Sequence, residues 1–177
     1  PGAEENSPPL CTTEDPFVSC PSHNALLDEY EPYARTEDIE PVFAELKEKL
    51  VPLVEKITAT EKFPAKGIID QDFAIAKQEE LGRQVLADLG FDLEAGRLDV
   101  AVHPFCSGTS RDDVRLTTRY SADWLPGSLF GTIHEAGHGL YEQGLPADAV
   151  GTPAGGSVSL GIHESQSRLW ENMVGRS

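Results

Sequence analysis

Basic side chains are scarce in this sequence. The chain has 14 Lys and Arg residues against 30 Asp and Glu residues, which gives a formal net charge of −16 at pH 7. Because a surface of that sign repels phosphate groups, we expect neither nucleic acid nor an anionic membrane surface as a partner. The simplest interpretation of the excess carboxylates is a solubilising acidic face.

Long apolar runs are also missing. No segment approaches the roughly 18–20 apolar residues that are needed to span a bilayer. The first residues, PGAEENSPPLCTTEDPF, lack the basic patch and the apolar stretch of a signal peptide. We therefore expect a soluble, cytoplasmic protein.

Cysteine is rare, and its positions show no ligand pattern. Cys11 and Cys20 are nine residues apart, unlike the short C-x-x-C spacing of zinc sites, and Cys106 stands alone. An odd number of cysteines with this spacing argues against a disulfide framework. Reduced thiols are the expectation.

The chain is long enough for one globular domain. It has 177 residues, of which 39% are hydrophobic and 25% are charged, as in proteins that bury a core. Residues 1–25 are rich in Pro, Ser and Thr, so we expect loop or poorly ordered chain there.

Two segments show the spacing of amphipathic helices. In residues 36–57, apolar side chains recur every three or four positions, and Pro52 is expected to kink or split the helix. Residues 71–92 predict a second helix that stops at Gly90. Its predicted inward face consists of Ala76, Leu81, Val85, Leu86 and Leu89.

The period then becomes alternating. RLDVAVHPF (97–105) and DDVRLTTRY (112–120) alternate apolar and polar residues, with CSGTSRD between them. This pattern predicts a small antiparallel hairpin or sheet in which residues 106–112 form the turn.

Two further helices follow, which makes the fold class mainly α. The first covers residues 126–144 and the second residues 158–175, with a Gly- and Pro-rich loop between them. In the second helix, helical spacing predicts an apolar stripe of Val158, Ile162, Leu169 and Met173. A polar stripe of Glu164, Ser167 and Glu171 lies beside it.

The helix over 126–144 contains an H-E-x-x-H motif. His134 and His138 are four residues apart, so both imidazoles leave the same face and can reach one zinc ion. Glu135 lies about a quarter turn away, where it can take a proton from water at the metal. The alternative is a buried helix whose histidines form hydrogen bonds with neighbouring groups. Gly137 and Gly139 argue against it, because their low helix propensity indicates that another group must approach the helix closely there.

The residues alone leave the third ligand open. A metzincin would place Gly where this chain has Tyr141, so that class is excluded. The last helix offers Glu164, Glu171 and His163. Glu164 is the first choice for a ligand, whereas His163 and Glu171 are better suited to hydrogen-bond a ligand from behind.

Four motifs in order, HPF (103–105), DVRLT (113–117), HEAGH (134–138) and HESQSRLWEN (163–172), resemble the carboxypeptidase Taq family of zinc metallocarboxypeptidases. The resemblance is dense from about residue 63 to residue 177 and looser over 25–62. It implies a mainly helical, neurolysin-like core with a groove over the zinc. By this likeness residues 26–177 form part of a catalytic domain, the central segment of a longer enzyme.

The resemblance also implies roles. His134, His138 and Glu164 would bind zinc, for which cobalt can substitute in some members, and Glu135 would activate water. The resemblance further implies a homodimer that removes single C-terminal residues from peptides.

The two remaining motifs are candidate groove residues. The DVRLT strand is suited to hold an extended peptide by main-chain hydrogen bonds, with Thr117 on that strand. Arg115 can attract the substrate carboxylate or pair with Asp113 instead. His103 either faces the same groove or is a packed histidine.

Three functions fit these features. The first is a metallocarboxypeptidase, or a segment of one, that acts on peptides with a free C-terminus. The second is a metal-binding helical segment without catalysis, and the third is a related endopeptidase, which would cleave peptides with a blocked C-terminus.

Overall fold

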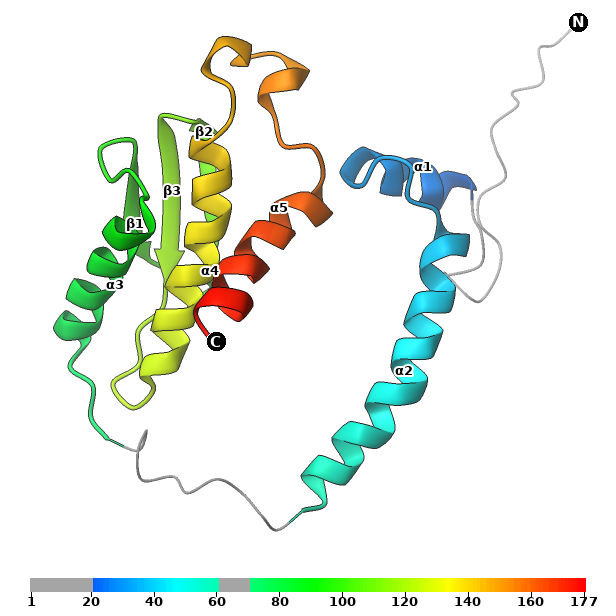
Figure 1. Cartoon of the computed structure of the whole chain (residues 1–177), viewed down its shortest axis with the longest axis horizontal. Coiled ribbons are helices and arrows are strands. Elements are labelled where there is room, and N and C mark those ends of the chain that lie inside the picture. Colours follow the sequence, from blue (N-terminus) through cyan, green and yellow to red (C-terminus); the bar gives the residue numbers. More distant parts are fainter. Residues whose placement is uncertain (1–20, 61–70) are drawn as a thin grey trace, which may run out of the picture. The chain divides into compact units, whose positions relative to one another are not determined.

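The computed structural model describes residues 21–60 and 71–177, and the chain divides into two compact units, residues 1–64 and 65–177. Figure 1 shows the element order along the chain. In the described parts, no helix is both long and apolar enough to cross a membrane.

The first unit contains two helices, α1 (Pro21–Tyr30) and α2 (Thr36–Thr58). Loop was therefore the wrong expectation for residues 21–25, and residues 1–20 lie outside the described residues. The side chain of Asn24 in α1 accepts a hydrogen bond from the Thr36 backbone N–H at 2.9 Å. This bond satisfies one of the unpaired donors at the start of α2.

Helix α2 confirms the helical periodicity, and it runs through Pro52 as one element instead of splitting there. Its apolar face, however, is exposed: Val42 is 61% accessible and Ile57 55%. The periodicity therefore identified the helix and its apolar face, although the described residues do not cover that face.

The second unit begins with α3 (Ile75–Leu89), which ends as predicted at Gly90. Gly90 has φ 88°, a left-handed conformation that suits glycine, and the Phe91 N–H closes the end by donating to the Leu86 carbonyl. The predicted inward face was only partly right. The buried positions are Gln78, Gly82 and Leu86, while Ala76 and Leu81 are exposed.

A polar side chain sets the inward face of α3. Gln78 donates to the carbonyls of Phe73 and Ser121 and accepts a hydrogen bond from the Ser128 hydroxyl. Because these partners lie in other segments, Gln78 is buried with its hydrogen bonds satisfied. Hydrophobicity alone cannot identify such a position.

The sheet has three strands, β1 (Gly96–Val100), β2 (Cys106–Ser110) and β3 (Asp113–Thr118), in the order β1-β3-β2. The small sheet is confirmed, but its expected pairing was wrong in two respects. β1 runs parallel to β3, and the segment expected to be a turn forms β2, which pairs antiparallel with β3. A tight turn around Arg111 and Asp112 joins β2 and β3.

Strand β3 is central, so its main-chain groups pair with a strand on each side. The expectation that DVRLT binds an extended peptide through its main chain is therefore wrong. An added peptide strand needs a free edge, and the edges of this sheet are β1 and β2.

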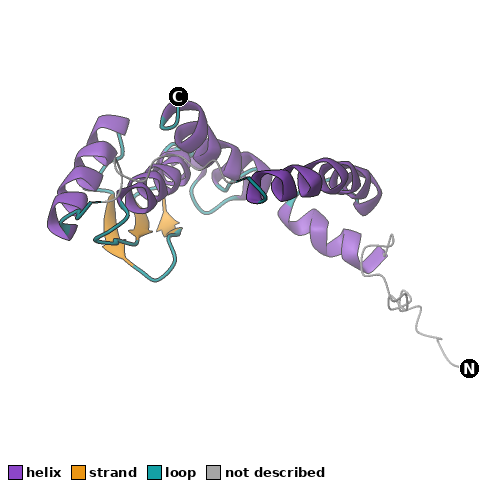
Figure 2. Ribbon diagram, turned by 90° about the horizontal axis from the view of Figure 1, so that it is seen from below, coloured by secondary structure: helices purple, strands orange, loops and turns teal. Residues whose placement is uncertain are grey.

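Helices α3 and α4 (Leu125–Gln143) cover one face of the sheet, and Figure 2 shows the strands to one side of the helices. The core between them comprises Leu86, Phe91, Leu98, Val114, Leu116 and Ala136. Alternation along β3 turns Val114, Leu116 and Thr118 toward α4 and leaves the intervening residues on the other face.

The chain closes with α5 (Leu160–Arg168), which continues as a π-helical segment, Leu169–Val174. Two short 3-10 turns, Ala147–Ala149 and Pro153–Gly155, lie in the loop between α4 and α5. Ser159 begins α5 by accepting the Ile162 N–H at 3.1 Å, an N-terminal cap. The predicted apolar stripe of this helix is exposed, from Val158 at 69% to Met173 at 70%.

Candidate metal centre

The two histidines of the H-E-x-x-H motif leave α4 on the side that faces α5. His134 and His138 are one helical turn apart, and their ring centroids are separated by 5.0 Å. Both side chains are largely buried, at 19% and 15% exposure. The spacing of four residues thus gives the shared face that the sequence predicts.

Helix α5 can approach this face closely because α4 has a glycine at the crossing. A Cβ atom at Gly137 would lie 2.6 Å from the Gln166 carbonyl oxygen and 2.6 Å from the Ser167 Cα. Ser167 itself is fully buried. The glycine therefore lets the two backbones touch, which brings the first turns of α5 to the histidines.

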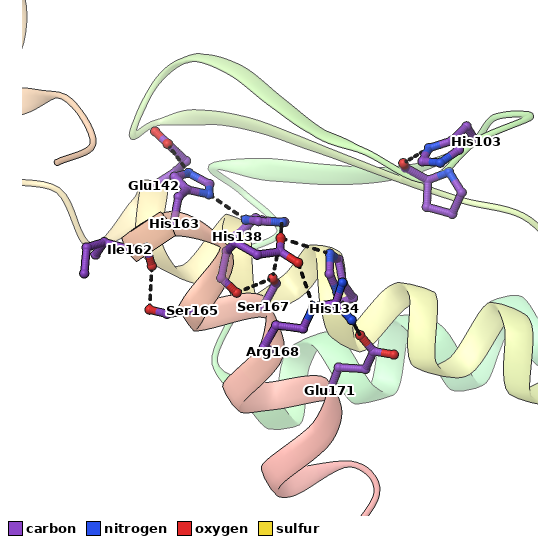
Figure 3. Close-up of polar contacts among 12 residues, drawn as sticks. His103, His134, His138, Glu142, Ile162, His163, Ser165, Ser167, Arg168 and Glu171 are labelled. Atoms are coloured by element: carbon purple, nitrogen blue, oxygen red, sulfur yellow. Dashed lines mark hydrogen bonds and ion pairs between the residues drawn. The ribbon is translucent and has the colours of Figure 1, made fainter. Parts of the chain in front are cut away.

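Glu164 is the α5 side chain that reaches them. Its Oε2 lies 3.2 Å from Nε2 of His138 and 3.7 Å from Nε2 of His134, and Figure 3 labels both of these histidines. The ligand atoms of the three side chains all lie within 4.8 Å of one another. Among the described residues, this is the one group of His, Cys, Asp and Glu side chains with such a geometry.

The donor set suits a divalent metal. Two imidazole nitrogens and one carboxylate oxygen form the three-ligand set of many catalytic zinc sites. Burial, together with the neighbouring His163 and His134, holds the pKa of His138 below its usual value, which favours the neutral ring that a metal needs.

Two other side chains of α5 keep Glu164 ionised. Burial opposes its ionisation, but hydrogen bonds from Arg168 and Ser167 outweigh burial and hold the pKa of Glu164 below its usual range. Arg168 Nε donates to Oε1 at 2.7 Å, on the opposite side of the carboxylate from the histidines. Oε1 is thus held by Arg168, while Oε2 accepts from the Ser167 hydroxyl at 3.0 Å and faces the two Nε2 atoms.

Glu171 contacts His134 at Nδ1, the ring nitrogen that does not face Glu164. Its Oε2 is 2.9 Å from Nδ1 of His134, and its Oε1 accepts from Arg176 at 2.7 Å. Arg176 in turn lies over the Phe130 ring, 4.0 Å from its centroid. Burial opposes ionisation of Glu171, but these hydrogen bonds from Arg176 and His134 outweigh it, so its pKa is lowered.

His163 contacts His138 in a corresponding way. Its Nδ1 lies 2.5 Å from Nδ1 of His138, and its Nε2 lies 2.6 Å from Oε1 of Glu142. The sequence placed His163 beside a ligand but did not identify Glu142, which is one turn beyond His138 on α4. A spacing of four residues from His138 was the available signal.

Arg168 and Arg176 were also missed. Arg168 stands four residues after Glu164, a spacing that favours an ion pair on a helix. Arg176 is five residues after Glu171, beyond regular α-helical pairing, and the intervening π-helical segment brings the two together.

Glu135 is 6% exposed and lies beside the histidines without joining the three-ligand group. Burial raises its pKa above the usual value, and the nearby His134 acts in the opposite direction. A buried carboxylate with a raised pKa accepts a proton more readily than one in water. Its buried position beside the two histidines therefore suits Glu135 to the role of general base.

The three predicted groove residues are not gathered at the cluster. Arg115 pairs with Asp113, with Nε to Oδ1 at 2.8 Å, on the sheet face turned away from α4. Thr117 is buried, where its hydroxyl accepts the Phe105 N–H at 2.9 Å. Thr117 therefore anchors the HPF loop.

His103 lies on that loop, apart from the cluster in Figure 3, with Nδ1 2.6 Å from the Pro104 carbonyl oxygen. Pro104 approaches α4 at Gly131, one turn before Glu135. His103 is also near enough to Glu135 to act on the pKa of that carboxyl, more weakly than burial does.

The chain is similar in sequence to known metallopeptidases. The sequence profile of the carboxypeptidase Taq (M32) metallopeptidase family matches residues 18–177. The chain is 50% identical to thermostable carboxypeptidase 1 of Thermus thermophilus over 155 residues, which are 88% of this chain and 30% of that protein. It is 44% identical to carboxypeptidase 1 of Bacillus subtilis over 88% of this chain and 31% of that protein.

A solved structure gives the same result for the fold. The M32 carboxypeptidase from Deinococcus radiodurans superposes with a TM-score of 0.78 at 44% identity. The match covers 86% of this chain and 31% of that one. The chain therefore spans about a third of the length of the relatives it matches.

Proposed function

The chain belongs to the carboxypeptidase Taq family of metallopeptidases, and on that premise we propose that it is the segment of a zinc-dependent metallocarboxypeptidase that carries the metal centre. The observation that supports this most strongly is the approach of Glu164 to both Nε2 atoms of an H-E-x-x-H helix. The reaction is hydrolysis of the C-terminal peptide bond.

We propose that His134, His138 and Glu164 bind the metal and that the metal is zinc. The ligand set of two nitrogens and one oxygen supports zinc, and cobalt is the expected substitute. Three protein ligands leave positions open for water and substrate, as a catalytic site requires.

A bound metal supplies Lewis acidity, which polarises the scissile carbonyl and makes water a better nucleophile. Glu135 takes the proton from the attacking water and later passes it to the leaving amine. The burial that raises the pKa of Glu135 supports both steps, because the carboxylate must first gain and then release a proton.

The substrate is proposed to be a peptide with a free C-terminus, held along an edge of the sheet. Of the two edge strands, β2 contacts α4, so β2 replaces β3 as the strand for main-chain pairing. His103 remains a candidate substrate contact because of its effect on Glu135. Arg115 and Thr117 are better explained by their contacts with Asp113 and the HPF loop.

The wider setting is also a proposal. Residues 26–177 are assigned to part of one catalytic domain, and the full-length protein is proposed to be a cytoplasmic homodimer. The net charge of −16 supports the view that neither nucleic acid nor an anionic membrane surface is a partner.

The test is Glu135→Gln. Loss of the base should reduce peptide hydrolysis by about 10²- to 10⁴-fold while the metal content stays unchanged, because Glu135 is outside the ligand group. Hydrolysis is measured on one peptide with a free C-terminus and on the same peptide with a blocked one. Cleavage of the blocked peptide would indicate an endopeptidase, and loss of metal from the variant would contradict the assignment of Glu135 as base.

One observation favours a second function. The chain spans only about a third of its relatives' length, so the groups that complete the groove can lie outside it. The alternative is a metal-binding helical segment without catalysis. It predicts that the 177-residue chain binds zinc but releases no product from the free peptide, whereas the first proposal predicts measurable turnover.

A further inference from the structure

A chain of polar contacts leads from the proposed metal ligand His138 toward the surface. Nδ1 of His138 lies 2.5 Å from Nδ1 of His163, and Nε2 of His163 lies 2.6 Å from Oε1 of Glu142. His163 is 16% exposed and Glu142 31%. Two histidine nitrogens at this separation must share one proton, since each can either donate or accept.

Metal binding at Nε2 of His138 determines where that proton lies. A neutral imidazole that binds through Nε2 carries its proton on Nδ1, so His138 donates to Nδ1 of His163. Nδ1 of His163 then has no proton, and its Nε2 carries one and donates to Glu142. If a neutral His163 ring donated from Nδ1 instead, its unprotonated Nε2 would face the Glu142 carboxylate, and two acceptors would lie 2.6 Å apart.

Packing fixes the ring of His163 in this position. Its ring meets the His138 ring edge to edge, with centroids 4.7 Å apart and planes inclined at 29°, and the Tyr141 ring centroid lies 4.9 Å from its own. The Tyr141 hydroxyl accepts the Val158 N–H at 3.2 Å, which ties the segment before α5 to α4. His163 therefore lies between two residues of α4, and its own helix is held against them.

The two proposed histidine ligands are supported differently. Nδ1 of His134 contacts the Glu171 carboxylate directly, at 2.9 Å, whereas Nδ1 of His138 reaches the Glu142 carboxylate only through His163. An apolar side chain at position 163 would fill the space but leave the N–H of His138 without an acceptor. A buried donor without a partner costs free energy, and the ring would be free to turn away.

We propose that His163 and Glu142 are positioning residues that hold His138 in the tautomer and orientation in which Nε2 faces the metal. This inference rests on the proposed function only in taking His138 as a ligand. Neither residue belongs to the three-ligand group. Their effect is on metal affinity and acts through His138.

The experiment uses the 177-residue chain and three variants. His163→Leu removes the acceptor and the donor, whereas His163→Gln retains both, in its side-chain oxygen and amide. His23→Leu, in α1, is the matched control for the loss of one histidine. The zinc dissociation constant is measured by competition with a chromophoric chelator.

The expected result is zinc binding about 10- to 100-fold weaker in His163→Leu, near wild-type binding in His163→Gln, and no change in His23→Leu. Equal affinity of His163→Leu and the wild type would overturn the inference while leaving the proposed function intact. If the wild-type chain bound no zinc, the proposed metal centre would itself fail.

A second measurement does not depend on the folding of a variant. Nitrogen-15 NMR of the zinc-loaded wild-type chain reports which ring nitrogens carry protons. The proposal requires a proton on Nδ1 of His138, none on Nδ1 of His163, and one on Nε2 of His163. A proton on Nδ1 of His163 would contradict it.

Discussion

Each proposed metal ligand makes a polar contact with another residue through the atom that does not face the metal site. Nδ1 of His134 faces Glu171, Nδ1 of His138 faces His163, and Oε1 of Glu164 accepts from Arg168. Such contacts restrict the rotation of the ligands before a metal arrives, so less conformational freedom is lost on binding. The site is preorganised by partners on α4 and on the chain from α5 onward.

Spacing along the sequence predicted only those site residues that lie on a single helix. His134, Glu135 and His138 follow from the period of one helix. Glu164 had to be chosen among three candidates, because the choice depends on how α5 crosses α4 at Gly137. For Arg115, alternation along the strand defined two faces but did not say which face meets α4.

Cys106 provides a test at the scale of one residue. Burial, with smaller effects of Glu135 and Glu142, raises the pKa of this thiol from 9.0 to about 12. The unfolded chain releases the Cys106 proton near pH 9 and the folded chain does not, so the free energy of unfolding falls as pH rises from about 9 to 12.

Cys106→Ala should remove this contribution. Between pH 9 and pH 11, urea unfolding of the variant should show a shallower fall in the free energy of unfolding than the wild type shows. Cys11 and Cys20 are present in both proteins, so their titration cancels in the comparison. Identical slopes would show that the folded structure does not suppress ionisation of Cys106.

At the scale of elements, the glycines of α4 determine which neighbours can approach. Gly137 meets the backbone of α5, and a Cβ at Gly139 would lie 2.7 Å from the Phe91 ring and 3.0 Å from the Leu116 side chain. Their positions explain why a helix keeps two residues with low helix propensity. The sequence predicted close approach here, and the structure identifies the partners.

Gly137→Ala should separate α4 from α5. The new methyl group would meet backbone atoms at 2.6 Å, so we expect a loss of about 1–3 kcal/mol of stability and weaker metal binding as Glu164 retreats. Gly131→Ala is the matched control in the same helix. Its nearest neighbour would be 3.7 Å away, so the higher helix propensity of Ala should leave it neutral or up to about 1 kcal/mol more stable. Equal stability of the two variants in urea unfolding would argue against close contact between α4 and α5 at Gly137.

The sheet shows why pairing is harder to predict than strand content. CSGTS contains Ser and Gly, which favour turns, yet it forms β2 because β3 offers a free edge beside it. β1 pairs parallel with β3 because residues 101–105 carry the chain across and leave β2 to return at the other edge. These outcomes depend on contacts between segments, which a local pattern does not contain.

At the scale of the whole molecule, all the proposed ligands and their partners lie in the second unit, residues 65–177. The same unit contains the sheet and the core. The apolar faces of α2 and of the segment from Val158 to Met173 were predicted as faces, but they are exposed in the described structure. Periodicity identifies an apolar face without naming what covers it.

The most direct test of the metal centre is the metal content of the purified 177-residue chain, measured by mass spectrometry beside Glu164→Ala. One divalent ion per wild-type chain and its loss in the variant are the predicted result, because Glu164 supplies the third ligand atom. A full equivalent of metal in Glu164→Ala, or none in the wild type, would contradict the assignment of His134, His138 and Glu164 as the metal site.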